Sequence, residues 1–436
     1  MAKNKCAVEI TQKQIESDEF KSRHRHDDKA YTRERRLPFA LMMVLIMRNS
    51  VKSLQNVVNE AITWLDLPPV TASAYPQVRY KLKHTAFIEL NQTAVVDNLY
   101  GDGDYQRFWG FRVLAVDGSK LVLPDTVSIR DAFGTIACTD GKTAETQGER
   151  PYALASVLYD ALNRVALDAT LGKAKAYEID LAAGHLPHTR PGDLLTMDRN
   201  YPSYRMLAEL SRHRRDFAIR CSAASFAEAR RMLKGEGEDS QVVTLSPCAG
   251  QLPAIRGLGL PLSLTLRFVR VLLTTGEYEV LVTSLLDSYL YPTDGFLELY
   301  RLRWGIETFF GLLKTRLELE NFTGTGAEAV RQDFHATVYL SGVESMLTDT
   351  AQAMLDAKDT LYPQTVNRAV SFNAVKNLAL DLILGGGLET DALLEQLTAL
   401  FLTNPCLARG HRNPPRKNTS SRTLLSFHKR QKKHCF

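Results

Sequence analysis

Apolar residues recur with a helical period near the start of the chain and with a strand period in its middle. From Leu37 to Asn49, and again from Leu54 to Leu65, the apolar positions keep helical spacing, and a further helix is expected to run through Phe87. Residues 1–36 are polar, so we expect them to be loosely ordered. The pattern therefore predicts a mainly helical segment over the first hundred residues.

The period changes to that of strands from Phe111. An apolar run ends in Asp117-Gly-Ser and resumes at Leu121, which predicts a hairpin at the Asp-Gly turn. Strands are also predicted at 153–160, 164–171, 192–198 and 216–221, with helices near 174–183 and 202–212. Strands that alternate with helices favour a mixed α/β sheet.

Residues 222–290 depart from this alternation. A short helix at 226–234 is followed by strand-like segments near 241–245, 263–274 and 278–285, which we interpret as a β-rich insertion. Amphipathic helices are predicted from Ala327 to about Leu402, and a basic tail follows.

When the stretch from Tyr300 to Lys314 is placed on a helix at about 100° per residue, its apolar and polar side chains fall on opposite faces. The apolar face holds Leu302, Ile306, Phe309, Leu313 and Leu317. The opposite face aligns four polar side chains, those of Tyr300, Arg303, Glu307 and Lys314. Such a face is most often exposed to solvent, with ordinary ion pairs between its residues. In that case Arg303 and Lys314 would simply pair with Glu298, Glu307 or Glu318. The alternative is a carboxylate flanked by cations that meets phosphates and a metal ion together.

Two aspartates upstream could join Glu307 in such a site. Asp117 and Asp198 each follow an apolar strand, although either one could simply be a turn residue. Three carboxylates that are not neighbours in sequence form an oxygen-rich set of the kind that selects Mg²⁺ or Mn²⁺. Two such ions can activate a nucleophile and stabilise the leaving oxygen of a phosphoryl transfer.

Composition indicates a globular protein with a polyanionic partner. The 436 residues suggest two to four structural units, and 44% of them are apolar, enough for a substantial core. Although the net charge is only +5, residues 409–436 hold nine Lys and Arg and no acid. A second basic run, residues 21–36, contains seven Lys and Arg, including Arg23, Arg25, Arg33, Arg35 and Arg36. Either run could instead be a solubilising segment.

Other site classes find little support. The six cysteines form no CxxC pair and the ten histidines lack zinc-finger spacing, so we expect neither disulfides nor a zinc site. His185 and His188 flank a proline and are expected on a surface loop. The apolar run at 37–47 is too short to span a bilayer, which favours a cytoplasmic protein without a membrane partner.

The spacing Tyr-x2-Arg-x3-Glu-x6-Lys, complete here, resembles the signature of a family of bacterial transposases, the insertion sequence four family. The segments AVDGS, LLTMDRNY and YRLRWGIETFFGLLK are similar, in order, to the three acidic motifs of DDE transposases. The resemblance implies a ribonuclease H-like core interrupted by a β-rich insertion. It also implies that Asp117, Asp198 and Glu307 are catalytic and hold Mg²⁺ or Mn²⁺, and that Tyr300, Arg303 and Lys314 contact DNA.

The N-terminal segments SRHRHDDKAYTRERRLPF and VTASAYPQVRYKL also resemble this family, whose members bind transposon ends through this region. The short helices expected here could form a helix-turn-helix or a plain helical bundle. Further candidate DNA contacts are Arg35, Arg36, Arg79, Lys81 and Arg199.

These expectations define a domain organisation. We expect a helical DNA-binding region at 1–100, a core at 101–221 and 291–350, the insertion at 222–290, and C-terminal helices with the basic tail at 351–436. The protein would cleave and join DNA strands, as a homodimer assembled on DNA. The alternatives are a silent DNA-binding derivative and a nuclease of the same fold.

Two features depart from the family. Asn200 stands where the family commonly has a glycine, directly after Asp198-Arg199. The predicted insertion contains no tryptophan, whereas some relatives have a base-stacking tryptophan there. Whether the reaction includes a flipped base or a DNA hairpin is therefore an open question.

Overall fold

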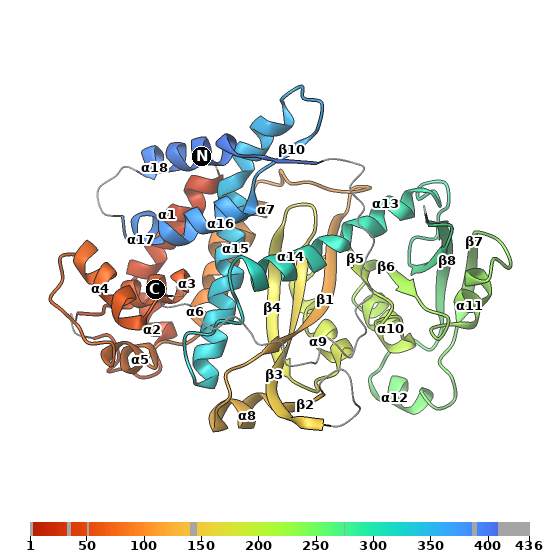
Figure 1. Ribbon diagram of the computed structural model, residues 1–436. Coiled ribbons are helices and arrows are strands. Elements are labelled where there is room, and N and C mark those ends of the chain that lie inside the picture. Colours follow the sequence, from red (N-terminus) through yellow and green to blue (C-terminus); the bar gives the residue numbers. More distant parts are fainter. Residues whose placement is uncertain are drawn as a thin grey trace.

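In the computed structural model, the described residues are 3–32, 36–49, 52–139, 146–273, 275–385 and 390–408. Helices from both ends of the chain gather on one side of a large mixed sheet, at the left of Figure 1. The N-terminal helices are α1 (Lys3–Glu16), α2 (Asp18–His24), α3 (Phe39–Arg48), α4 (Leu54–Trp64), α5 (Ala74–Arg79), α6 (Thr85–Leu90), the π-helix η1 (Asn91–Asp97) and α7 (Asn98–Tyr100). The C-terminal helices are α15 (Ala327–Asp356), α16 (Arg368–Asn377), α17 (Ala379–Leu384) and α18 (Thr390–Thr403).

The expectation that the first 36 residues are loosely ordered is wrong, because α1 and α2 occupy most of the part that the structure describes. In α1, Val8 and Ile15 are buried at helical spacing, and in α2 Phe20 is buried. Ser17 caps α2 by accepting a hydrogen bond from the Phe20 N–H. The segment is polar overall, but it contains a narrow apolar stripe that is buried.

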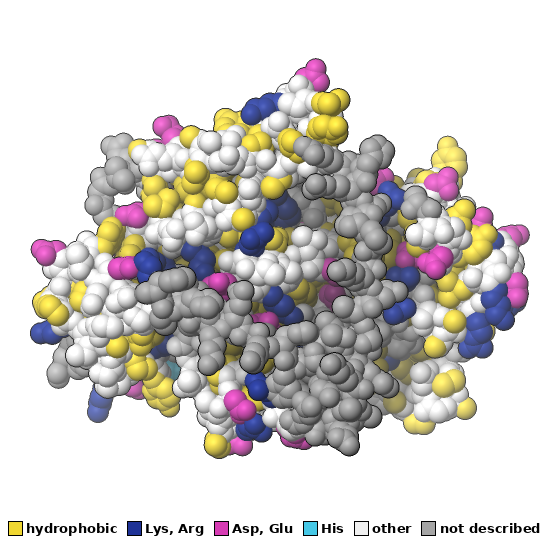
Figure 2. Space-filling view, viewed as in Figure 1, with side chains coloured by type: hydrophobic (Ala, Val, Ile, Leu, Met, Phe, Trp, Pro, Cys, Tyr) yellow, Lys and Arg dark blue, Asp and Glu magenta, His cyan; other side chains and the backbone are white. Residues whose placement is uncertain are grey.

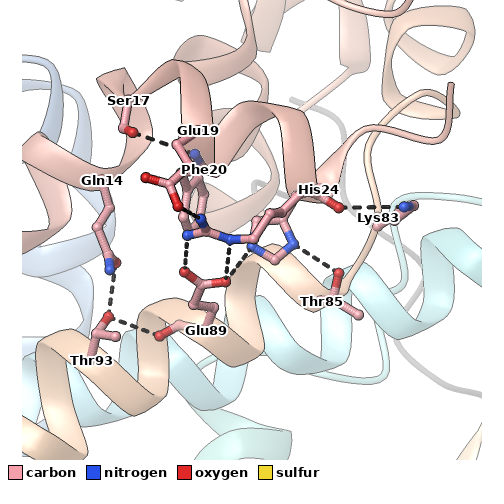
Figure 3. A network of polar contacts seen from close by, with 10 residues as sticks. Gln14, Ser17, Glu19, Phe20, His24, Lys83, Thr85, Glu89 and Thr93 are labelled. Atoms are coloured by element: carbon pink, nitrogen blue, oxygen red, sulfur yellow. Dashed lines mark hydrogen bonds and ion pairs between the residues drawn. The ribbon is translucent and has the colours of Figure 1, made fainter. Parts of the chain in front are cut away.

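A polar network fastens α2 to α6 (Figure 3). The Glu89 carboxylate pairs with Arg23 and accepts a hydrogen bond from His24, whose other ring nitrogen contacts Thr85 at 2.9 Å. Arg23 also pairs with Glu19. Arg23 was a candidate phosphate contact, but in this structure its charge is already matched by two carboxylates.

The central sheet contains nine strands in the order β2-β3-β1-β5-β6-β9-β8-β7, with β4 also paired to β3. β1 pairs antiparallel with β3, while β1, β5 and β6 are parallel neighbours. The strands are β1 (Arg112–Val122), β2 (Thr135–Thr139), β3 (Thr146–Asp160), β4 (Val165–Lys173), β5 (Asp193–Met197), β6 (Asp216–Cys221), β7 (Ser240–Leu245), β8 (Leu264–Leu272) and β9 (Tyr278–Thr283). A two-stranded sheet is formed by β10 (Gln364–Thr365) and β11 (Cys406–Leu407). The expected mixed α/β sheet is confirmed.

The predicted hairpin at Asp117-Gly118 is wrong, because β1 runs unbroken through it. Asp117 lies opposite Val157, and Gly118 lies opposite Ser156. The long strand β3 offers a continuous row of backbone partners, and a turn at Gly118 would leave that row unpaired. Pairing along the sheet therefore overrides the local turn signal of Asp-Gly.

The three strands predicted in the insertion exist as β7, β8 and β9, and they extend the central sheet because β9 pairs antiparallel with β6. This part of the sheet lies at the right of Figure 1 with α11 (Ala227–Leu233) and α12 (Leu252–Gly257).

Two helices pack against the central sheet, one on β1 and the other on β4. Helix α14 (Trp304–Thr315) follows α13 (Gly295–Leu302) after a single interrupting residue, and α15 packs between β4 and the helical lobe (Figure 1). The remaining helices are α8 (Val127–Phe133), α9 (Glu178–Gly184), the 3₁₀-helix η2 (Leu186–His188) and α10 (Tyr204–Arg212).

His185 is not on a surface loop, contrary to expectation. Its side chain is buried and contacts the Asp168 carboxylate at 2.6 Å and the Ser156 hydroxyl at 2.9 Å. The four cysteines whose side chains are described are free. Among the described helices, none is both long and apolar enough to cross a membrane.

Candidate active site

Asp117 lies in the middle of β1 and points toward α14. Side chains alternate along a strand, so Ala115, Asp117 and Ser119 share one face. Tyr159, which lies opposite Ala115 on β3, stacks on Phe309 of α14 with ring centroids 4.5 Å apart. The Lys314 ammonium at the far end of α14 donates to the Ser119 hydroxyl at 2.7 Å. Asp117 therefore lies beneath α14, between these two contacts.

Asp198 follows the adjacent strand β5 immediately. Val116 and Met197 are register partners on the parallel strands β1 and β5, so Asp117 and Asp198 occupy the next positions on neighbouring strands. The Asp198 carboxylate accepts a hydrogen bond from the Asn200 N–H at 2.8 Å. Asn200 is not among the described residues with positive φ, so this turn does not require the glycine common in the family.

Glu307 is in the first turn of α14, where the helix dipole favours a carboxylate. Its side chain remains 43% exposed and pairs with the Arg303 guanidinium at 2.7 Å. The buried face of α14 consists of Ile306, Phe309, Phe310 and Leu313. The prediction of an apolar face that packs on the core is confirmed.

The charges of Asp198 and Glu307 act on Asp117. Burial, together with the charges of Asp198 and Glu307, raises the pKa of Asp117 to about 7, against the opposing effects of the Gly118 N–H and Arg303. Burial and the charge of Asp198 also raise the pKa of Glu178, at the start of α9. Negative charge thus accumulates around Asp117 beyond what Arg303 compensates, and such a donor set fits a divalent cation.

In this conformation, however, the described residues contain no group of three or more His, Cys, Asp or Glu side chains arranged to hold a metal ion. Glu307 is engaged by Arg303, and Asp198 by its own turn. Shared metal ligation by Asp117, Asp198 and Glu307 therefore stays a prediction that requires side-chain rearrangement.

Tyr300 and Arg303 do not lie on an exposed polar face, contrary to expectation. Both residues are only 2% exposed. The Tyr300 ring belongs to an apolar cluster with Phe296 and Leu299, and the Arg303 guanidinium lies over the rings of Tyr300 and Trp304. Arg303 does lie beside Glu307, as the helical wheel predicts, but the end of α13 packs against the sheet, so that Tyr300 and Arg303 are buried.

Three buried polar atoms around this centre have no hydrogen-bond partner in the structure. They are the hydroxyl groups of Tyr201 and Tyr300 and the Nε atom of Arg303. The sequence reasoning overlooked Tyr201 and Glu178. Only the position of Tyr201, three residues after Asp198 in an acidic motif, could have singled it out.

Lys314 contacts β1. Its ammonium donates to the Ser119 hydroxyl and to the Lys120 carbonyl at 2.8 Å. Lys314 therefore joins the end of α14 to β1 at Ser119, two residues after Asp117.

Arg79 is not available to DNA, contrary to expectation. It is 3% exposed, and its guanidinium pairs with Asp333 at 2.7 Å and also donates to Gln332 and Thr323. Its helix, α5, has only six residues, which favours the helical-bundle alternative over a helix-turn-helix. Arg79 thus connects the N-terminal helices to α15.

The other proposed DNA contacts differ in accessibility. Arg36 and Lys81 line a groove of about 440 Å³ between the start of α3 and α5. Arg199 is exposed beside Asp198. Arg35 and the tail at 409–436 lie outside the described residues. Figure 2 shows a further group of Lys and Arg on the lobe that carries α11, whose last turn contains Arg230 and Arg231.

Comparison with known proteins connects this geometry to one family. The family model described as "Transposase DDE domain" matches residues 109–340, just over half of the chain, and this range contains Asp117, Asp198 and Glu307. The transposase InsG of insertion sequence element IS4 from Escherichia coli (strain K12) is 25% identical over 303 residues. That alignment covers 67% of this chain and 65% of InsG, less than two thirds of the length of the relative.

Among solved structures, a cryo-EM structure of the piggyBac transposase synaptic complex with hairpin DNA is similar. The match covers 90% of this chain and 85% of that chain, with a TM-score of 0.45 and 10% sequence identity.

The resemblance found in the sequence is thus confirmed by a family match that spans the sheet, both aspartates and the glutamate helix, and the chain belongs to the DDE-domain transposases.

Proposed function

We propose that this protein is a DNA transposase that binds the ends of an insertion sequence, cleaves DNA strands and joins them to a target. The observation that carries the proposal is the juxtaposition of Asp117 and Asp198 at the same level of two parallel strands, beneath the helix that bears Glu307. Carboxylates brought together from three separate elements are a costly arrangement unless a cation offsets their repulsion.

The strand order supports a ribonuclease H-like core. The strands β4, β3 and β1 pair antiparallel in succession, and β1, β5 and β6 then continue the sheet in parallel. Within this proposal, residues 101–221 and 291–350 form the core, and residues 222–290 are an insertion that extends its sheet. Residues 1–100 would form the N-terminal helical DNA-binding region, and residues 351–436 would supply the C-terminal helices and the basic tail.

The family uses divalent metal ions, and we propose Mg²⁺, with Mn²⁺ as a substitute, held by Asp117, Asp198 and Glu307. When bound, such ions lower the pKa of a water nucleophile and stabilise charge on the phosphate. The Arg303 guanidinium pairs with the Glu307 carboxylate at 2.7 Å and would have to release it for a cation to bind. The β1–β5 pairing fixes the relative height of the two aspartates, which are both half-buried.

DNA would approach over exposed and half-buried cations. The candidates are Arg36, Lys81, Arg199, Lys314, Arg230, Arg231 and the basic tail. Arg303 and Tyr300 could contact DNA only after the end of α13 moves, because both are buried. We further propose a homodimer assembled on DNA in the cytoplasm.

The test is a reaction of the full-length protein with labelled insertion-sequence ends and Mg²⁺, with nicked and joined products resolved on a gel. Joined products are expected for a transposase. Nicked products alone would identify a nuclease of the same fold, and specific binding without cleavage would identify a silent derivative.

A further inference from the structure

Tyr201 has a buried hydroxyl group that contacts no partner. The residue is 1% exposed, and its ring belongs to the main apolar core. The hydroxyl oxygen has neither solvent contact nor a hydrogen bond in the structure. Since the great majority of buried side-chain polar atoms are hydrogen-bonded, this exception requires an explanation.

The hydroxyl lies among the charged groups of the candidate active site. Besides burial, the carboxylates of Asp117, Glu178 and Asp198 raise the pKa of Tyr201, and Arg303 opposes them. Asp117 exerts the largest of these charge effects. The phenol is therefore a neutral donor that feels the charge of three carboxylates but donates a hydrogen bond to none of them in this conformation.

The surrounding backbone holds the ring in place. The Tyr201 N–H donates to the Asp198 carbonyl at 3.2 Å, and the Tyr201 carbonyl accepts from the Ser203 N–H at 2.7 Å. Ser203 in turn caps α10 by accepting from the Met206 N–H. The Tyr201 backbone is thus held between the end of β5 and the start of α10, and the packing of the ring in the apolar core restricts where its hydroxyl can point.

A phenylalanine would fill the same apolar space without an unpaired hydroxyl. An unsatisfied buried donor destabilises a protein, while its removal with the shape preserved can be neutral or stabilising. The hydroxyl therefore contributes nothing to the fold in this state. It becomes useful only if one of the nearby carboxylates turns toward it.

We propose that Tyr201 is a positioning residue of the acidic centre: when Asp117 turns to bind a divalent cation, the Tyr201 hydroxyl donates a hydrogen bond to its carboxylate and fixes that orientation. This inference rests on the proposed cation site. Hydrogen bonds from outer residues to ligating carboxylates commonly change metal affinity about 10- to 100-fold.

The experiment measures Mn²⁺ binding by titration calorimetry and melting temperature without cation, both on the full-length protein. The variants are Tyr201→Phe, Asp117→Asn and a control, Tyr339→Phe. Tyr339, on α15, is also buried, but its hydroxyl contacts the Thr11 hydroxyl at 2.6 Å. Neither Tyr339 nor Thr11 belongs to the three acidic motifs.

We expect Tyr201→Phe to bind Mn²⁺ about 10-fold more weakly than wild type, with an unchanged or higher melting temperature. Tyr339→Phe should show the reverse pattern, with wild-type Mn²⁺ affinity and a melting temperature lower by about 2 °C.

Two results would overturn the inference while leaving the proposed function intact. One is wild-type Mn²⁺ affinity in Tyr201→Phe. The other is a fall in its melting temperature comparable with that of Tyr339→Phe, which would assign the hydroxyl to the fold. If wild type itself binds Mn²⁺ no better than Asp117→Asn, the proposed cation site fails, and the inference fails with it.

Discussion

Asp117 is an acid whose ionised form the fold disfavours, since burial and its acidic neighbours raise its pKa from 3.8 to about 7. The ionised carboxylate lowers the stability of the cation-free protein, and a bound cation would remove this destabilisation. The perturbation therefore connects the energetics of a single residue with the function proposed for the site.

Replacement of this carboxyl group should stabilise the protein while it abolishes cleavage. For an acid whose folded pKa is raised, stability falls as pH rises from the unfolded pKa of 3.8 to the folded value near 7. Asp117→Asn should therefore gain stability relative to wild type across this window, with a plateau above it. At about 1.4 kcal/mol per pKa unit, the gain is on the order of 2–4 kcal/mol.

Urea denaturation of the cation-free protein between pH 5 and about pH 8 measures this difference. A constant difference across this range, or a less stable variant at neutral pH, would show that the fold does not disfavour the ionised carboxyl group.

Arg79 provides a second prediction at the residue scale, because it forms a buried ion pair with Asp333. Arg79→Met should cost about 3–5 kcal/mol, since it leaves a buried carboxylate uncompensated. The double variant Arg79→Met with Asp333→Leu should recover much of that loss. Denaturation curves of both variants provide the measurement, and a single variant as stable as wild type would exclude a structural role.

At the scale of elements, β1 shows what sequence can and cannot predict. The apolar run predicts the first half of β1, but the prediction that this strand ends at Asp117 in an Asp-Gly turn is wrong, because Asp117 lies in the middle of the strand. Propensity describes a dipeptide in isolation, whereas β1 is held by partners on both sides. The same limit explains Tyr300, since the helical period assigns a face but does not identify what packs against it.

Gly118→Ala tests whether β1 is continuous in solution. A Cβ atom at Gly118 would lie 3.4 Å from Leu154 and 3.5 Å from Glu178, which is ordinary contact, and φ here is not positive. The substitution should therefore change stability by less than about 0.5 kcal/mol. In a tight Asp-Gly turn, where glycine needs positive φ, alanine would cost more than about 1 kcal/mol, so a loss of that size would favour the hairpin.

At the scale of the whole molecule, the sequence predicted most strands and the C-terminal helices, whose apolar periods are strong. It missed the order of residues 3–24, where helical apolar positions are few, and the burial of Arg79, whose partners lie on α15, about 250 residues away. Contacts between segments distant in sequence leave no local pattern. The acidic residues were found because their motifs resemble a family, not because periodicity marked them.

The basic tail at 409–436 offers a prediction at this scale. If it contacts DNA phosphates, its deletion should lower affinity and reduce the slope of log K against log salt by about 0.9 for each lost contact. Fluorescence anisotropy with labelled ends at several salt concentrations measures both quantities. An unchanged slope after deletion would identify the tail as a solubilising segment.

The central claim is that Asp117, Asp198 and Glu307 act as one cation-dependent centre. The most direct measurement is Mg²⁺-dependent strand cleavage of labelled ends by wild type, Asp117→Asn, Asp198→Asn and Glu307→Gln, with end binding measured on the same samples. We predict that each variant binds the ends as wild type does and shows no detectable cleavage. Cleavage at the wild-type rate in any one of the three variants would contradict the account.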